Sequence, residues 1–251
     1  MISTIAKFAL PVAATALLCG CSTSFEAPTT LSATDQLEVG ERRLLAVEEY
    51  ADGESLAGMA TLYIPPVRIA SGAVIDEGIS PARLSAVRRR ISRDLCQRLA
   101  RAGFEVQSTI DAPDGRLSVA ITGLRRNNVA TTGISRLIGI AVPGPLNPRV
   151  PLGVGALGAE AEIFDPDGRQ VAAIRWASRN HLASGGGITT ILDGPDAFTD
   201  LADVMDLSSV FADAMGDLVT EARESAGAEL TAETPRGTCD AYDALIANES
   251  G

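Results

Sequence analysis

The chain begins with an apolar run that is too short to cross a membrane. This run, FALPVAATALL, occupies residues 8–18 and follows a weakly basic stretch that includes Lys7. A transmembrane helix needs about 20 apolar residues, and Pro11 interrupts this run. An apolar core of this length near the N-terminus is typical of a secretory signal, which is removed on export. We therefore expect a signal peptide at residues 1–20, with the folded part of the chain after it.

The signal ends in Leu18-Cys19-Gly20-Cys21, which resembles the lipobox of bacterial lipoproteins. The resemblance implies cleavage before Cys21 and attachment of fatty acyl chains such as palmitate to that cysteine. Several acyl chains hold a protein stably on a membrane, whereas one does so only marginally. Ser22, rather than Asp, follows the anchor, and by the same resemblance this implies the outer membrane of a Gram-negative bacterium, facing the periplasm. The alternative is a plain signal peptide with an incidental cysteine.

The charge of the chain excludes one class of partner. Its formal net charge is −11, so it lacks the basic patch with which proteins bind nucleic acid. Only 4% of the residues are aromatic, although 46% are hydrophobic, so the core must be mainly aliphatic. We expect residues 21–56 to be a lipidated tether and residues 57–251 a single periplasmic domain, since this length suits one domain of ordinary size.

Two helices are predicted by periodic apolar residues. The first begins at the N-cap Ser80 with Pro81 in its first turn and ends before Gly103, each a residue type that favours its position. Its apolar residues recur at steps of three and four along one face: Leu84, Val87, Ile91, Leu95 and Leu99. The second runs from about Ser208 to Ala226, with Phe211, Ala214, Met215, Leu218 and Ala222 on one side.

Several segments read as strands. They are TLYI before Pro65, FEVQ after the first helix, GRLSVAITGLRR, and two strands joined by the turn Asp165-Pro166-Asp167-Gly168. Proline and glycine in that turn supply the dihedral angles of a hairpin. A sheet with both helices on one face buries both helix stripes. The expected fold class is therefore α+β, with a mixed sheet of about five strands and two helices packed on one face.

The lipobox, LYIPPVRI and AEAEIFDPDGRQVAA together resemble a family of Gram-negative lipoproteins known only as a domain of unknown function. The order of elements is also similar to the N-terminal domain of TolB and to curli-secretion lipoproteins. Those domains bind partners and catalyse no reaction, which implies a non-catalytic role here. The family has no assigned functional residues, so none can be carried over. Its turn often has Thr-Gly where this chain has Asp167-Gly168.

Two long insertions, residues 127–158 and 180–207, are candidates for a contact surface. Long segments without regular structure in a compact domain are usually functional or mobile, and exposed apolar patches often mark contact sites. The alternative is that they pack over the uncovered face of the sheet and replace a missing layer. The motif GVGALG within the first insertion precedes a strand rather than opening a helix, which argues against a dinucleotide site.

Catalytic and metal-binding residues are scarce. His181 is the only histidine, so any triad or histidine-based metal site must use it, and it reads more readily as a loop residue beside a glycine run. Asp165 and Asp167 read as turn residues, because the acidic ligand that ends an EF-hand loop is replaced by Trp176. We therefore expect no enzyme activity, no cofactor and no metal.

Two cysteines remain for the mature domain, Cys96 and Cys239. Export places them in an oxidising compartment, where exposed thiols tend to pair. Cys96 lies at the edge of the apolar stripe of the first helix, and Cys239 lies in a polar tail with Tyr242 close behind it. We predict a Cys96–Cys239 disulfide that holds the C-terminal tail across the first helix. The alternative is two unpaired cysteines, with Cys96 a small buried residue.

The function expected from the sequence is that of a non-catalytic outer-membrane lipoprotein that binds an unidentified envelope protein or acts as a scaffold. One alternative is an accessory lipoprotein of a lipid-transport system, whose mark would be an apolar groove between sheet and helices. Another is an envelope hydrolase that uses His181 with an unknown nucleophile. The sequence does not indicate an oligomeric state.

Overall fold

The structure is a computed structural model, and it describes residues 29–40, 46–107, 113–126, 155–179, 202–231 and 237–242. Its helices are α1 (Gly53–Ala57), α2 (Pro81–Arg101) and α4 (Ala202–Ser225). Its strands are β1 (Glu38–Val39), β2 (Ala46–Ala51), β3 (Thr61–Tyr63), β4 (Arg68–Ile75), β5 (Glu105–Gln107), β6 (Gly115–Arg125), β7 (Ala156–Phe164) and β8 (Gln170–Arg179).

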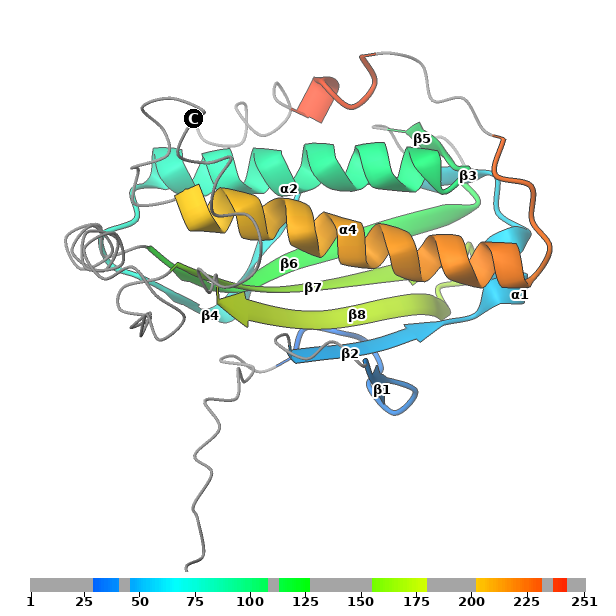
Figure 1. Cartoon of the computed structure of the whole chain (residues 1–251), viewed down its shortest axis with the longest axis horizontal. Helices are drawn as coiled ribbons and strands as arrows, with labels where there is room; N and C mark the ends of the chain where they lie inside the picture. Colours follow the sequence, from blue (N-terminus) through cyan, green and yellow to red (C-terminus); the bar gives the residue numbers. More distant parts are fainter. Residues whose placement is uncertain are drawn as a thin grey trace, which may run out of the picture.

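The strands form one mixed sheet in the order β1-β2-β8-β7-β6-β3-β5, with β4 paired to β6 beyond β3. The strands from β1 to β6 in this order pair antiparallel, whereas β3 and β4 run parallel to β6 and β5 runs parallel to β3. Helices α2 and α4 lie side by side across one face (Figure 1). The expected α+β class is confirmed, but the sheet has eight strands rather than about five.

Helix α2 forms where its sequence signals place it. The Ser80 side chain accepts a hydrogen bond from the Arg83 amide, and Pro81 occupies the first turn, where its missing N–H costs nothing. At the other end Gly103 has φ +88°, a conformation that favours glycine. The stripe predicted from periodicity faces the core, with four members that are fully buried: Val87, Ile91, Leu95 and Leu99.

The core lies between the two long helices and the sheet. The fully buried Trp176 of β8 and Phe211 of α4 face each other there, with ring centroids 5.7 Å apart. The remaining core residues are mostly aliphatic, as the low aromatic content requires. Every second residue of β6, β7 and β8 points into this layer, because side chains alternate between the two faces of a strand.

The boundary between tether and domain requires a correction. Residues 21–56 were expected to be a tether, but β1, β2 and α1 lie within that range, and β2 pairs along its whole length with β8. The folded domain therefore begins well before residue 57. The reason is that β2 is held by the distant β8, and that α1, although Asp52 caps it locally, is bound by the distant Arg223 of α4.

The predicted disulfide is present. It joins Cys96 of α2 to Cys239, with the two Cα atoms 5.6 Å apart. Close to it, the fully buried Tyr242 donates a hydrogen bond from its hydroxyl to the Ile64 carbonyl at 2.9 Å. Burial raises the pKa of that hydroxyl above its ordinary value. The C-terminal tail thus crosses α2 and reaches the edge formed by β3 and β5.

Asp114 ties the start of β6 to β3, and we predict an acid-sensitive contribution to stability from it. Its carboxylate accepts hydrogen bonds from the Ala60 and Thr61 amides, both at 2.9 Å. These bonds hold the pKa of Asp114 below its ordinary value, the Thr61 amide having the largest effect. A lowered pKa gives a contribution that is complete above the ordinary value near 4 and is lost as pH falls through the folded-state pKa.

Asp114→Asn is therefore expected to lower the free energy of unfolding by about 1 kcal/mol at pH 7 and by almost nothing near pH 2. Urea unfolding across this pH range measures the difference. The exposed Glu229→Gln serves as a control that should change little at either pH. A loss of stability in Asp114→Asn that stays constant with pH would contradict the prediction.

Candidate functional site: two buried carboxylates beneath an N-terminal strap

Strand β7 presents two acidic residues on the face of the sheet that α2 and α4 do not cover. Glu160 and Glu162 alternate along β7 with Ala159, Ala161 and Ile163, which are fully buried in the helix-facing core. Alternation therefore directs both carboxylates to the opposite face. Even so, Glu160 is only 2% exposed and Glu162 only 4% exposed. Acidic side chains are almost never buried so deeply unless they have partners.

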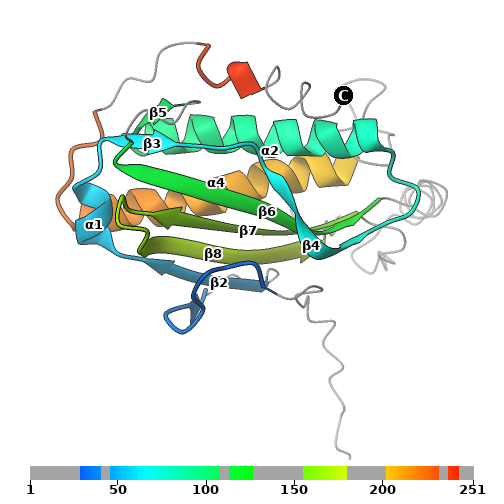
Figure 2. The same cartoon turned by 180° about the vertical axis from the view of Figure 1, so that it is seen from behind.

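The partners come from residues 29–40, which we call the strap. The amide and hydroxyl of Thr30 both donate to one oxygen of Glu160, at 2.6 and 2.7 Å. The amide and hydroxyl of Ser32 both donate to one oxygen of Glu162, each at 2.8 Å. Figure 2 shows the strap, in dark blue, on the face of the sheet turned away from α2 and α4. The two-residue spacing of the strap donors matches the two-residue spacing of the acceptors along β7.

Other side chains of the sheet complete this polar site. Gln170 of β8 donates from Nε2 to the Ala33 carbonyl at 3.2 Å and to Glu162 at 3.0 Å. Arg175 of β8 donates from Nε to the second oxygen of Glu160 at 3.1 Å and forms an ion pair with Glu48 of β2. The two carboxylates are therefore held from the sheet side as well as from the strap side.

This arrangement can bind an extended segment of chain. The carboxylates only accept hydrogen bonds, and the strap supplies an N–H and an O–H donor at every second residue. Hydrogen bonds to charged acceptors are stronger than those between neutral groups. In the described part of the chain, no cluster of three or more residues of the kinds that bind metal ions is found. The geometry of the hydrogen bonds suits the binding of an extended peptide segment.

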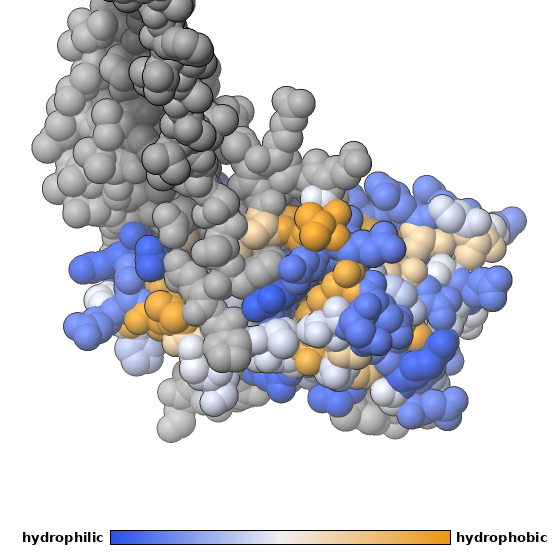
Figure 3. Space-filling model, turned by 90° about the horizontal axis from the view of Figure 1, so that it is seen from below, coloured by the Kyte–Doolittle hydropathy of each residue, from blue (hydrophilic) through white to orange (hydrophobic). Residues whose placement is uncertain are grey.

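The strap continues into the acidic edge of the sheet. Strand β1 pairs with β2 so that Glu38 lies opposite Glu49 and Val39 opposite Glu48. Like charges directly across two strands destabilise the pairing, and Val39 is 81% exposed. Figure 3, which views the molecule from the β1–β2 side, shows hydrophilic residues with small apolar patches between them. This end of the strap is therefore weakly held.

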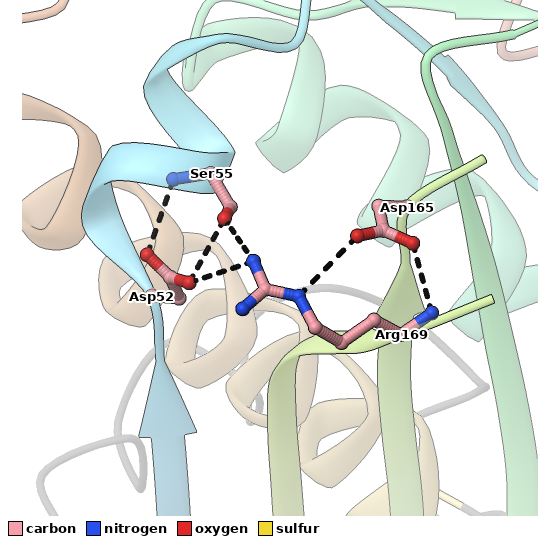
Figure 4. Close-up of polar contacts among 4 residues, drawn as sticks. All are labelled: Asp52, Ser55, Asp165 and Arg169. Atoms are coloured by element: carbon pink, nitrogen blue, oxygen red, sulfur yellow. Dashed lines mark hydrogen bonds and ion pairs between the residues drawn. The ribbon is translucent and has the colours of Figure 1, made fainter. Parts of the chain in front are cut away.

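A second polar cluster fastens the β7–β8 hairpin to α1 (Figure 4). Asp52 caps α1 by accepting from the Ser55 amide, and Arg169 donates to Asp52 at 3.0 Å and to Asp165 at 3.4 Å. The Ser55 amide, more than any other group, lowers the pKa of Asp52, and the Arg169 amide lowers that of Asp165. The hydrogen bond to Asp165 is the main cause of a raised pKa of Arg169. Arg169 pairs with both carboxylates, so each charged group of the cluster has a partner within it, which indicates a structural role.

The structure places some of the predicted site residues and not others. Cys96 and Cys239 are joined, whereas Cys21 and His181 lie outside the described residues. Most of both insertions also lies outside them, at residues 127–154 and 180–201. The remaining parts of the insertions belong to regular elements, because residues 156–158 are in β7 and residues 202–207 are in α4.

Sequence reasoning missed Glu160 and Glu162 as site residues. The signal was available in the segment AEAEIF, where two acidic residues alternate with apolar ones in a predicted strand. Such a strand is buried on its apolar face, and acidic residues on the other face of a central strand need partners if that face is also covered. The partner could not be identified, because Thr30 and Ser32 lie in a polar segment with no period.

No family model matches the chain, and no curated protein matches it. Among solved structures it is similar to the PelC dodecamer from Paraburkholderia phytofirmans, with a TM-score of 0.40, 11% identity, and coverage of 70% of this chain and 98% of that one. It is also similar to a DUF4136 family protein from Bacteroides thetaiotaomicron, with a TM-score of 0.34, 8% identity, and coverage of 71% and 98%. These scores do not support the transfer of a partner, an assembly or a ligand to this chain.

Proposed function

We propose that this protein is a non-catalytic lipoprotein, anchored in the outer membrane through Cys21, whose periplasmic domain binds or scaffolds another envelope protein. The observation that carries this proposal is the strap. The chain that follows the expected anchor returns to the domain at Thr30 and is bound there by two carboxylates. A segment held in this way fixes the point on the domain to which the chain from the anchor is bound.

The described helices are consistent with attachment by lipid. None of them combines the length and the apolar character that a membrane-crossing helix needs. The longer of the two main helices, α4, carries Asp206, Asp213, Asp217 and Glu221 along its length. Under this proposal the membrane is reached through acyl chains on Cys21, which is the stable form of attachment when several chains are present.

The packing of the core bears on the lipid-transport alternative. That alternative calls for an apolar groove between the sheet and the helices. In the described residues this space is filled by side chains with no exposed area, among them Trp176, Ile174, Phe211 and Met215. The observation favours a packed scaffold over a lipid-binding groove. The hydrolase alternative depends on His181, which lies outside the described residues.

Replacing the expected anchor tests the proposal. Cys21→Ala is expected to leave unprocessed precursor with residues 1–20 still attached, because the lipid-dependent cleavage needs the cysteine. Incorporation of labelled palmitate, the mass of the N-terminal peptide, and membrane fractionation measure the outcome. Cys19→Ala is the matched control, which replaces the neighbouring cysteine by another small residue and should leave processing and lipidation intact. Normal cleavage of Cys21→Ala to a soluble periplasmic product would refute the lipoprotein assignment.

A further inference from the structure

We propose that the strap is a releasable latch that sets how far the domain stands from the membrane. When the strap is docked, it holds the domain close to the anchor. When it is released, its own length is added to the tether. This inference rests on the proposed attachment at Cys21 and adds a means of regulating the reach of the domain. It is carried by three features of the described residues: the contacts of the strap, the surface beneath it, and its position in the chain.

The strap is held by polar contacts to Glu160, Glu162 and Gln170, and none of its residues is fully buried. Every residue from Thr29 to Gly40 keeps some exposed surface, and none is buried in the core. Its contacts with the sheet include the four hydrogen bonds of Thr30 and Ser32, those donated by Gln170, and the short pairing of β1 with β2, which continues in the bond from the Gly40 amide to the Val47 carbonyl. Segments with few buried apolar contacts open locally at a small fraction of the free energy of global unfolding. The strap therefore belongs to the least stable part of the fold.

The surface beneath the strap tolerates exposure to water. Release of the strap would uncover Glu160, Glu162, Gln170 and Arg175, all of which are polar or charged. Carboxylates that lose the strap donors can accept hydrogen bonds from water instead, so little of the interaction is lost outright. The apolar core lies on the other face of β7 and stays covered by α2 and α4. Opening of the latch and unfolding of the domain are therefore separate events.

Because the strap lies between the expected anchor and the domain, its docking limits the distance between them. Thr29, the first described strap residue, lies eight positions after Cys21, and this length of chain spans at most about 29 Å when fully extended. With the strap released, the first residue held in the sheet becomes Ala46 of β2, 25 residues from the anchor. That length of chain spans at most about 90 Å. Release of the latch thus extends the maximum reach about threefold.

Thr30→Ala combined with Ser32→Ala tests the latch in the lipidated, mature protein bound to phosphatidylethanolamine–phosphatidylglycerol vesicles. The matched control is Thr34→Ala, which changes an exposed strap threonine other than the two residues that donate to Glu160 and Glu162. Amide hydrogen exchange at Thr30 and Ser32 measures docking. Energy transfer from a fluorophore at the exposed Asp217 to a headgroup dye measures the distance to the membrane.

We expect the test variant to exchange the two strap amides at least tenfold faster than the wild type, with unchanged exchange in α2 and a fall in energy transfer. The control should match the wild type in all three measurements. Strap amides that exchange at the unprotected rate in the wild type would overturn the proposal. The proposal would also be overturned if exchange at the strap amides of the test variant rose only together with exchange in α2. The same holds if strap exchange rose while energy transfer stayed unchanged.

The mass of the N-terminal peptide is determined first, so that the two proposals fail separately. A chain without acyl groups on Cys21 would refute the proposed function and the role of the strap in reach. Exchange at Thr30 and Ser32 would still show whether the strap is a latch. A lipidated chain whose strap never opens would refute the latch and leave the proposed function standing.

Discussion

Replacing both Cys96 and Cys239 by Ser is expected to lower the free energy of unfolding by up to about 5 kcal/mol, because the chain-entropy model assigns that value to loops of this length. The disulfide joins residues 143 positions apart in the sequence. Without it, the unfolded chain regains the freedom that closure of the loop removes. The loss is large beside the 5–15 kcal/mol that typically separates the folded from the unfolded state of a protein.

The structure also predicts where the effect of this change begins. Residues 237–242 contact the domain through Cys239 and through Tyr242, whose hydroxyl binds the Ile64 carbonyl. With the disulfide gone, the segment keeps the contacts of Tyr242 but loses its covalent link to α2, so we expect it to detach before the domain unfolds. Fast amide exchange at residues 237–242, with protection retained in α2, would show that order of events.

Urea unfolding of the double variant, compared with oxidised wild type, measures the loss in the free energy of unfolding. Tyr242→Phe is the matched control for the tail, since it keeps the ring and the disulfide but removes one buried hydrogen bond, which contributes about 1 kcal/mol. A double variant that loses less than Tyr242→Phe would show that the disulfide does not stabilise the fold.

The elements predicted correctly are those whose signals are local. Helix α2 carries its N-cap at Ser80, its apolar stripe and its terminal Gly103 within one continuous segment. The turn from Asp165 to Gly168 predicts the β7–β8 hairpin, and its glycine has φ +81°. The disulfide was predictable because the expected signal peptide and lipid anchor account for the other two cysteines, which leaves a single pair. In each case the determining residues are close together, or the alternatives are few.

The elements that were missed depend on contacts between distant residues. Strand β4 follows Pro65 and Pro66 and contains Gly72 at φ +81°, so local propensity argues against it, and it forms by pairing with β6. Strand β2 forms by pairing with β8, which lies more than 120 residues later in the chain. The strap is the extreme case, because its only signal is a pair of hydroxyl residues whose partners are Glu160 and Glu162. Such pairings become visible only when the sheet is assembled.

The second large effect is expected at Arg223, a charged residue that is only 3% exposed near the end of α4. Its Nη1 donates to the Leu56 carbonyl and, at 2.8 Å, to the Met59 carbonyl. Its guanidinium carbon lies 4.1 Å from the centroid of the Phe104 ring, a cation–π geometry. One side chain of α4 thus satisfies the backbone at the end of α1 and covers the residue that precedes β5.

Arg223→Met is expected to lower the free energy of unfolding by about 2–3 kcal/mol, because it removes two buried hydrogen bonds to backbone carbonyls and the cation–π contact. The Leu56 carbonyl still accepts a hydrogen bond from the Met59 amide. Methionine retains most of the length of the apolar stem, so the loss reports on the guanidinium rather than on a cavity. Burial lowers the pKa of Arg223, because the charged guanidinium loses its hydration in the core. Arg223→Met removes this desolvation cost, so the expected loss of stability is smaller than the summed contributions of the hydrogen bonds and the cation–π contact.

Urea unfolding of Arg223→Met measures the loss, and Arg101→Met provides the control. Arg101 lies exposed near the end of α2 and donates to the Gln97 carbonyl one turn earlier, so its replacement should change stability by no more than about 0.5 kcal/mol. Equal losses in the two variants would contradict the role assigned to Arg223. A selective loss at Arg223, with faster amide exchange at Met59 and Ala60, would show that α4 fixes the position of α1 and of the chain leading into β3. Because β3 pairs with the first residues of β6, that contact would connect the helical layer to the edge of the sheet where the tail is fastened.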